Sequence, residues 1–240
     1  MLQWTRDISA KSHNVGMLMI PNYQPSLPCE DKDGGLICSG SWNSSSVFAV
    51  GNGTDGALDE CGFTGCSSGL VLGSQWENKM FAINQQQHQK SYYAINEWGK
   101  WSGHWGPSAH SSPDIPLTVH AWVLSSFLLS NLQASGTTLV CTQCYGFGGT
   151  NFSWWPEDNT DIGKPVSMPT RAAKTGIWSR EFEKALVFAN PNSILPEAVK
   201  VQLPVVPGRT YREALGQTAL LDAEEGTLSL ATNQSAVLIW

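Results

Sequence analysis

The sequence predicts an α/β protein in two parts, and three observations lead to this prediction. Up to about residue 145, helix-like and strand-like segments alternate, which is typical of a parallel sheet. From residue 161 onward, short strand-like segments follow one another between turn residues, as in an antiparallel sheet or small sandwich. Apolar residues make up 41% of the 240 residues, which is normal for a folded chain. We therefore predict two domains, 1–160 and 161–240.

Three helices are expected in the first domain because their apolar residues recur at helical spacing. The second of these carries Ser74 and Glu77 at the spacing of a capping box, which predicts where it begins. The third begins at Pro116, a favoured residue of the first helical turn, and ends before Gly136. The predicted helices span residues 2–13, 74–89 and 116–133.

Four strands are expected in the same domain. The first is a continuous apolar run that ends before Pro21, as suits a parallel strand buried on both faces. The others are shorter runs between glycine-rich loops, and β-branched residues begin the last of them. The predicted strands span residues 15–20, 54–60, 91–97 and 137–144.

The second domain shows the spacing of antiparallel strands. Turn residues such as those at 190–192 and 206–209 separate its apolar segments, so we expect a β-sandwich-like fold. The predicted strands span residues 184–190, 198–203, 227–231 and 236–240.

Alternating strands and helices, joined by right-handed crossovers, predict a partial (β/α) barrel of the TIM type. A complete barrel has eight strands and about 250 residues, whereas only four strands are predicted here. We therefore expect domain 1–160 to be the later part of a barrel, completed by a missing N-terminal half or by a partner chain.

Charge and composition exclude several classes of function. The net charge is −6, only 14% of residues are charged, and no basic run occurs, so we expect no nucleic-acid partner. The most apolar segment contains Pro116, His120 and several serines, which argues against a membrane span. The glycine-rich loop 145–149 lacks the lysine of a phosphate loop, and the histidines are not spaced as metal ligands. We therefore expect neither a cofactor nor a metal.

Cysteines and glycosylation motifs leave the compartment open. The six cysteines fall into three close pairs, which suits disulfides, free thiols or, less well, a metal or redox site. Four Asn-X-Ser/Thr motifs favour a secreted or extracellular protein without deciding the question.

Two glutamates end neighbouring predicted strands. Glycoside hydrolysis requires two carboxyl groups held across the scissile bond, and the carboxyl ends of barrel strands form the active-site face. Glu60 and Glu97 meet this requirement, and few basic residues lie near them in the sequence. Asp55 or Asp59 would be the nucleophile instead if the strand ended earlier than residue 60. The alternative for each acid is a structural cap or ion pair.

Further polar and aromatic residues follow these strands. Tryptophan rings stack on the C–H faces of sugars, and the chain has 11 tryptophans, although many of them can instead fill the core. We expect the loop tryptophans at 98, 101, 105, 154 and 155 to be stacking candidates. The residues predicted to bind substrate are Asp55, Asp59, Asn22, Asn96, Trp98, Gln143 and Tyr145.

Short motifs throughout the chain resemble hypothetical glycoside-hydrolase-like (β/α)8-barrel proteins that carry a C-terminal β-domain. The resemblance implies that Glu60 is the nucleophile and that Glu97 is the acid/base. It also implies that the segment from residue 161 opens the C-terminal domain. The motifs lie at residues 1–8, 20–22, 55–63, 92–99, 161–165, 180–182 and 186–191.

These observations favour a retaining glycosidase or transglycosylase acting on a carbohydrate. A non-catalytic carbohydrate-binding protein or degenerate barrel fragment would bind sugar without turnover. A structural or interaction protein would bury its tryptophans away from any site.

Overall fold

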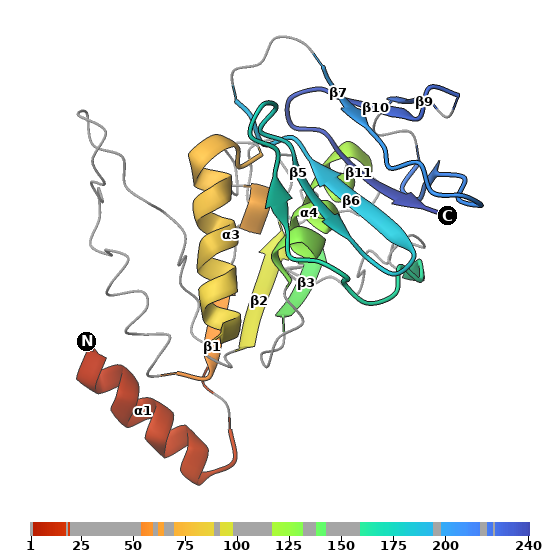
Figure 1. Cartoon of the computed structure of the whole chain (residues 1–240). Coiled ribbons are helices and arrows are strands. Elements are labelled where there is room, and N and C mark those ends of the chain that lie inside the picture. The colour runs from red at the N-terminus through yellow and green to blue at the C-terminus, as the bar shows by residue number, and fades with distance from the viewer. Residues whose placement is uncertain are drawn as a thin grey trace.

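A computed structural model describes twelve parts of the chain, in two groups with the gaps between them left aside. The first group covers residues 2–17, 19, 54–59, 62–64, 70–88, 92–97, 117–131 and 138–142. The second covers 159–193, 198–216, 220–222 and 224–240. The described elements form a mixed α/β fold with one parallel and two antiparallel sheets (Figure 1).

The first part of the chain supplies the helices and the parallel sheet. Its elements are α1 (Leu2–Asn14), β1 (Gly56–Asp59), the short 3-10 helix η1 (Gly62–Thr64), α3 (Gly73–His88), β2 (Tyr92–Glu97), α4 (Leu117–Ser130) and β3 (Thr138–Thr142). The strands lie in the order β1-β2-β3, and each neighbouring pair is parallel. The three predicted helices and the strands that became β1, β2 and β3 are thus confirmed.

The predicted strand over residues 15–20 is wrong at its beginning. Val15 and Gly16 instead form the turn that ends α1, with their N–H groups donating to the carbonyls of Ser12 and His13. Gly16 has a φ of 72°, the left-handed conformation that commonly closes a helix and that glycine adopts without strain.

The second part of the chain forms two antiparallel sheets. The larger has the order β4-β5-β6-β11-β8 and the smaller the order β7-β10-β9. Their strands are β4 (Thr170–Arg171), β5 (Trp178–Glu181), β6 (Ala185–Ala189), β7 (Val199–Gln202), β8 (Arg212–Glu213), β9 (Leu220–Asp222), β10 (Thr227–Leu230) and β11 (Ser235–Ile239). The four predicted strands match β6, β7, β10 and β11, whereas the other four are additional.

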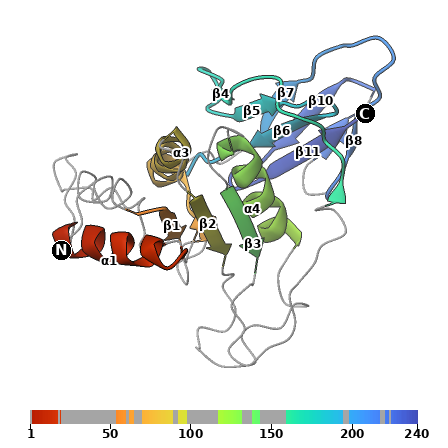
Figure 2. The same cartoon turned by 90° about the horizontal axis from the view of Figure 1, so that it is seen from below.

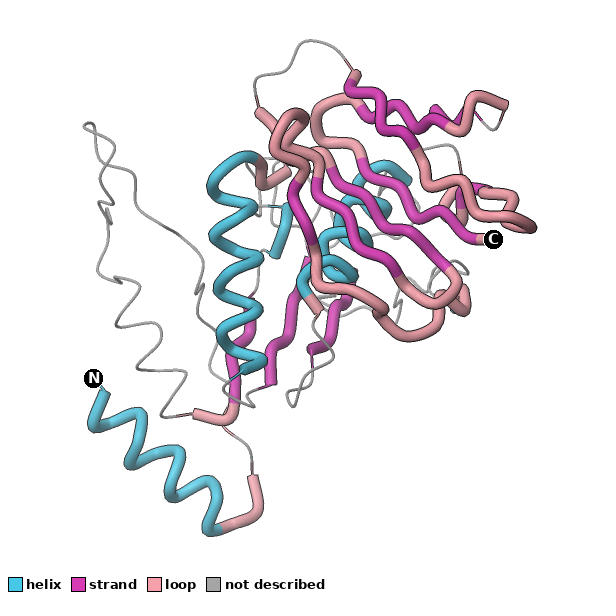
Figure 3. Tube along the Cα trace, viewed as in Figure 1, coloured by secondary structure: helices cyan, strands magenta, loops and turns pink. Residues whose placement is uncertain are grey.

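The elements stack in four layers, which Figures 1 and 3 show together. The parallel sheet contacts α3 and α4, and α4 in turn contacts β6 and β11 of the larger antiparallel sheet. The smaller antiparallel sheet covers the opposite face of that sheet. In the turned view of Figure 2, α3 and α4 lie on the same side of the parallel sheet.

Alternate residues of β6 and β11 serve two different cores. Ala185, Val187 and Ala189 pack with α3 and α4, in a core that also contains Val237 of β11. The intervening residues of the same strands belong to the core shared with the smaller sheet, namely Leu186, Phe188, Ala236 and Leu238. Successive side chains of a strand point to opposite faces, so both faces of the larger sheet are buried. Domain 161–240 is therefore packed directly on the helices of domain 1–160.

A cluster of aromatic rings lies at the centre of the helix layer. Trp76 of α3 is fully buried, and its ring centroid lies 6.2 Å from that of Trp122 in α4 and 5.6 Å from that of Trp178 in β5. Its indole N–H donates to the Ser126 hydroxyl at 2.9 Å, which satisfies the buried polar atom. For these tryptophans, the structure favours the core-filling interpretation over the sugar-stacking one.

Candidate functional site

The carboxyl ends of β1 and β2 lie side by side at one edge of the parallel sheet. The two strands are direct neighbours, and α3 occupies the connection between them. Each strand ends in an acidic residue, Asp59 for β1 and Glu97 for β2. Parallel strands present their carboxyl ends at the same edge, so the backbone brings these two positions together.

The strand register fixes how these positions relate. Asp59 is the partner of Ile95, two residues before Glu97, and Glu97 is the partner of Thr142 in β3. Asp59, Glu97 and Thr142 therefore occupy the same phase of the pleat. Asn96 occupies the other phase. This separates Asn96 from Glu97, although both were predicted to belong to one site.

The chain leaves the sheet directly after Asp59. Gly62, with a φ of 42°, begins η1, and the following Phe63 is fully buried with its ring 6.3 Å from that of Trp76. The carbonyl of Phe63 accepts a hydrogen bond from Val71 at 2.8 Å, just before α3. This packing ends β1 at Asp59, one residue earlier than predicted.

Most of the other predicted site residues lie outside the described part of the chain. This is the case for Glu60 and for four of the predicted substrate-binding residues, Asn22, Trp98, Gln143 and Tyr145. It also holds for the remaining stacking candidates, Trp101, Trp105, Trp154 and Trp155.

Asp55 lies at the opposite edge of the sheet and corrects the prediction that it accompanies Glu97. It precedes β1, so about 13 Å of strand separates it from Asp59. Its carboxylate accepts hydrogen bonds from His13 at 2.8 Å and from the Met19 N–H at 2.7 Å. Burial acts to raise the pKa of Asp55, but these hydrogen bonds and the charge of His13 outweigh it, so the pKa is lowered. Asp55 thus anchors the end of α1 to β1.

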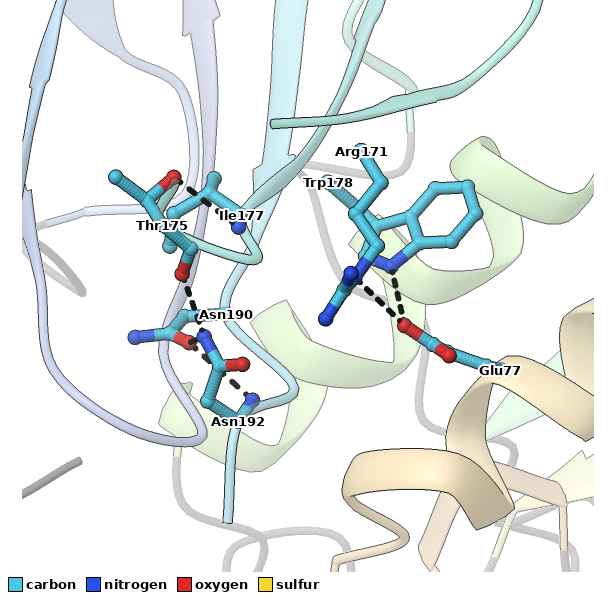
Figure 4. Close-up of polar contacts among 7 residues, drawn as sticks. All are labelled: Glu77, Arg171, Thr175, Ile177, Trp178, Asn190 and Asn192. Carbon is cyan, nitrogen blue, oxygen red and sulfur yellow. Dashed lines mark hydrogen bonds and ion pairs between the residues drawn. The ribbon is translucent and has the colours of Figure 1, made fainter. Parts of the chain in front are cut away.

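Glu77 has a different role from the predicted helix cap. Helix α3 begins at Gly73, and the Glu77 carboxylate accepts hydrogen bonds from the Trp178 indole at 3.2 Å and from Arg171 at 2.9 Å (Figure 4). It therefore joins α3 to β4 and β5. Sequence spacing alone gave no signal for this contact.

The amino end of α3 is attached to the turn after β6. The Gly73 N–H donates to the Pro191 carbonyl at 2.6 Å. Asn190 is fully buried, and its side-chain oxygen accepts from the Asn192 side chain, which also donates to the Thr175 carbonyl (Figure 4). These bonds hold the beginning of α3 in place, and α3 is the connection that makes β1 and β2 neighbours.

Arg180 of β5 holds the other helix. Its side chain is only 3% exposed and donates to the carbonyls of Leu128 and Asn131 at the end of α4, and to that of Ser167. Burial lowers the pKa of Arg180, while helix-end carbonyls without intrahelical partners supply the compensating negative potential.

Comparison with known proteins adds no relative. Neither the protein-family models nor the curated proteins give a match to this chain. Across the described ranges, no helix has both the length and the apolar character needed to cross a bilayer.

Proposed function

We propose that this chain forms part of a glycoside hydrolase or transglycosylase whose acid/base is Glu97. The second carboxylate comes from the end of β1, where the sequence analysis placed Glu60. The observation that carries the proposal is the arrangement of β1 and β2: neighbouring parallel strands, each with an acid at its carboxyl end. Two carboxyl groups flanking a glycosidic bond are what this chemistry requires.

The connectivity supports a barrel-like origin for the parallel sheet. Strand order follows chain order, and α3 and α4 lie on the same side of the sheet. A doubly wound sheet would instead reverse its strand order and carry helices on both faces. A barrel needs eight strands, and three are described here, so the proposal includes strands supplied by a missing N-terminal half or by a partner chain.

The test is a Glu97→Gln variant assayed with a panel of nitrophenyl glycosides of both anomeric configurations. Loss of a positioned acid/base group lowers turnover by about 100-fold to 10,000-fold, most strongly for glycosides with poor leaving groups. The matched control is Glu77→Gln, which makes the same change on α3 and is expected to leave turnover intact.

Full hydrolysis by Glu97→Gln would contradict the proposal. Saturable sugar binding without turnover by the unaltered chain would instead favour a non-catalytic carbohydrate-binding protein. The same calorimetric titration with oligosaccharides distinguishes this result from an absence of sugar binding, which would favour a structural or interaction role.

A further inference from the structure

We infer that Asp59, rather than Glu60, is the nucleophile that works with Glu97; this inference rests on the proposed function. It follows from the register of β1 and β2. Asp59 pairs with Ile95, so Asp59 and Glu97 share one phase of the pleated sheet. Consecutive residues of a strand alternate in phase, and therefore only one of two consecutive acids can match Glu97.

The backbone also sets a suitable separation. Neighbouring strands lie about 4.8 Å apart and each residue advances about 3.3 Å, so two residues of offset place the Cα atoms of Asp59 and Glu97 about 8 Å apart. Retaining glycosidases hold their two carboxyl groups about 5 Å apart and inverting enzymes up to about 9.5 Å apart. The Cα separation is compatible with carboxyl groups on either side of a single glycosidic bond.

The position of Asp59 in the fold is also rigidly determined. It is the last residue of β1, and the buried Phe63 of η1 fixes the point where the chain turns away from the sheet. A nucleophile must be held at a defined distance from the anomeric carbon, which favours the end of a strand over a loop.

The reaction then proceeds in two balanced steps. The Asp59 carboxylate attacks the anomeric carbon while the bond to the leaving oxygen breaks, and the carboxylic acid of Glu97 gives its proton to that oxygen. Water next attacks the anomeric carbon, its proton passes to the Glu97 carboxylate, and the bond between the sugar and Asp59 breaks. Both residues return to their starting states.

Two variants of the complete chain test this assignment against the nitrophenyl glycoside that the unaltered chain hydrolyses best. Asp59→Asn is expected to lose more than about 100-fold in turnover, and Glu60→Gln to lose at least tenfold less than that. Turnover by Asp59→Ala should recover with added azide, releasing a glycosyl azide. This recovery requires a folded site, so it separates a missing nucleophile from misfolding.

A direct readout uses the unaltered chain and a fluorinated aryl glycoside that forms a slowly hydrolysed glycosyl ester. Peptide mass spectrometry is expected to find the sugar on Asp59. A sugar on Glu60, an active chain without any ester, or full activity of Asp59→Asn would overturn the assignment. In each of these cases an inactive Glu97→Gln variant would leave the proposed function standing, whereas hydrolysis unaffected by Glu97→Gln would remove both.

Discussion

Replacing Arg180 with methionine should destabilise the protein strongly, because this side chain joins α4 to the larger antiparallel sheet. The guanidinium donates at 2.9 Å to the carbonyls of Ser167 and Leu128 and also to that of Asn131, and it lies 5.2 Å from the centre of the Phe182 ring. Methionine fills similar volume but donates no hydrogen bond, so it leaves these carbonyls without their charged donor.

The size of the effect follows from these contacts. A hydrogen bond to a charged group contributes about 1.5 to 3 kcal/mol, and removing one partner of a buried charged network typically costs about 3 to 5 kcal/mol. We therefore expect a loss of about 3 to 5 kcal/mol, which for a chain of this size lowers Tm by roughly 6 to 20 °C. Urea unfolding followed by circular dichroism and a thermal melt measure these two quantities.

Arg171→Met is the matched control, because it makes the same substitution on the neighbouring strand. Arg171 is 47% exposed, and its ion pair with Glu77 lies at the surface, so its loss should cost less than about 1 kcal/mol. Equal losses of stability in the two variants would refute the view that the buried guanidinium holds α4 in place.

Two further predictions follow from contacts described above and from the turn before β6. The pKa of Asp55 is lowered on folding, so its contribution to stability is present above the unfolded value of about 3.9 and is lost as pH falls through the folded value; the stability difference between the unaltered chain and Asp55→Asn should shrink on acidification, and a difference that grows in acid would contradict this. Gly163 has a φ of 71°, and a Cβ there would lie 2.6 Å from the Glu183 Cβ, so Gly163→Ala should cost more in urea unfolding than Gly208→Ala, whose added Cβ meets nothing within 4 Å. Equal costs at these two left-handed glycines would show that the Glu183 contact is easily relieved.

The sequence predicted best those elements whose apolar residues recur in a regular pattern. The stripe containing Trp76, Met80 and Ile83 identified α3, and these side chains are indeed buried. The apolar runs that became β6 and β11 were equally clear. In these elements the local pattern and the tertiary packing agree, so the one predicts the other.

The elements that the sequence missed are held by long-range contacts. β5 reads as polar because it contains Arg180, which is buried only since carbonyls from α4 surround it. β8 has two residues and exists through its pairing with β11. Their sequences carry no apolar periodicity of their own, so no local pattern could reveal them.

At the candidate site, the sequence identified the correct strand ends but not their phase. Which of two consecutive acids matches Glu97 depends on the register between β1 and β2, and register is a property of two segments together. Asp55 was misplaced for a related reason. Its role depends on where β1 begins, and element boundaries are the least certain part of a sequence-based prediction.

The two-sided burial of β6 and β11 also constrains how this protein can change through evolution. Helices α3 and α4 must fit the parallel sheet on one side and the larger antiparallel sheet on the other. A change in side-chain volume at Trp76 or Trp122 would require compensation in both neighbours at once, because close-packed layers accommodate little extra volume. Sequence drift should therefore be slowest in these two helices, and the two halves of the chain should be inherited as one unit.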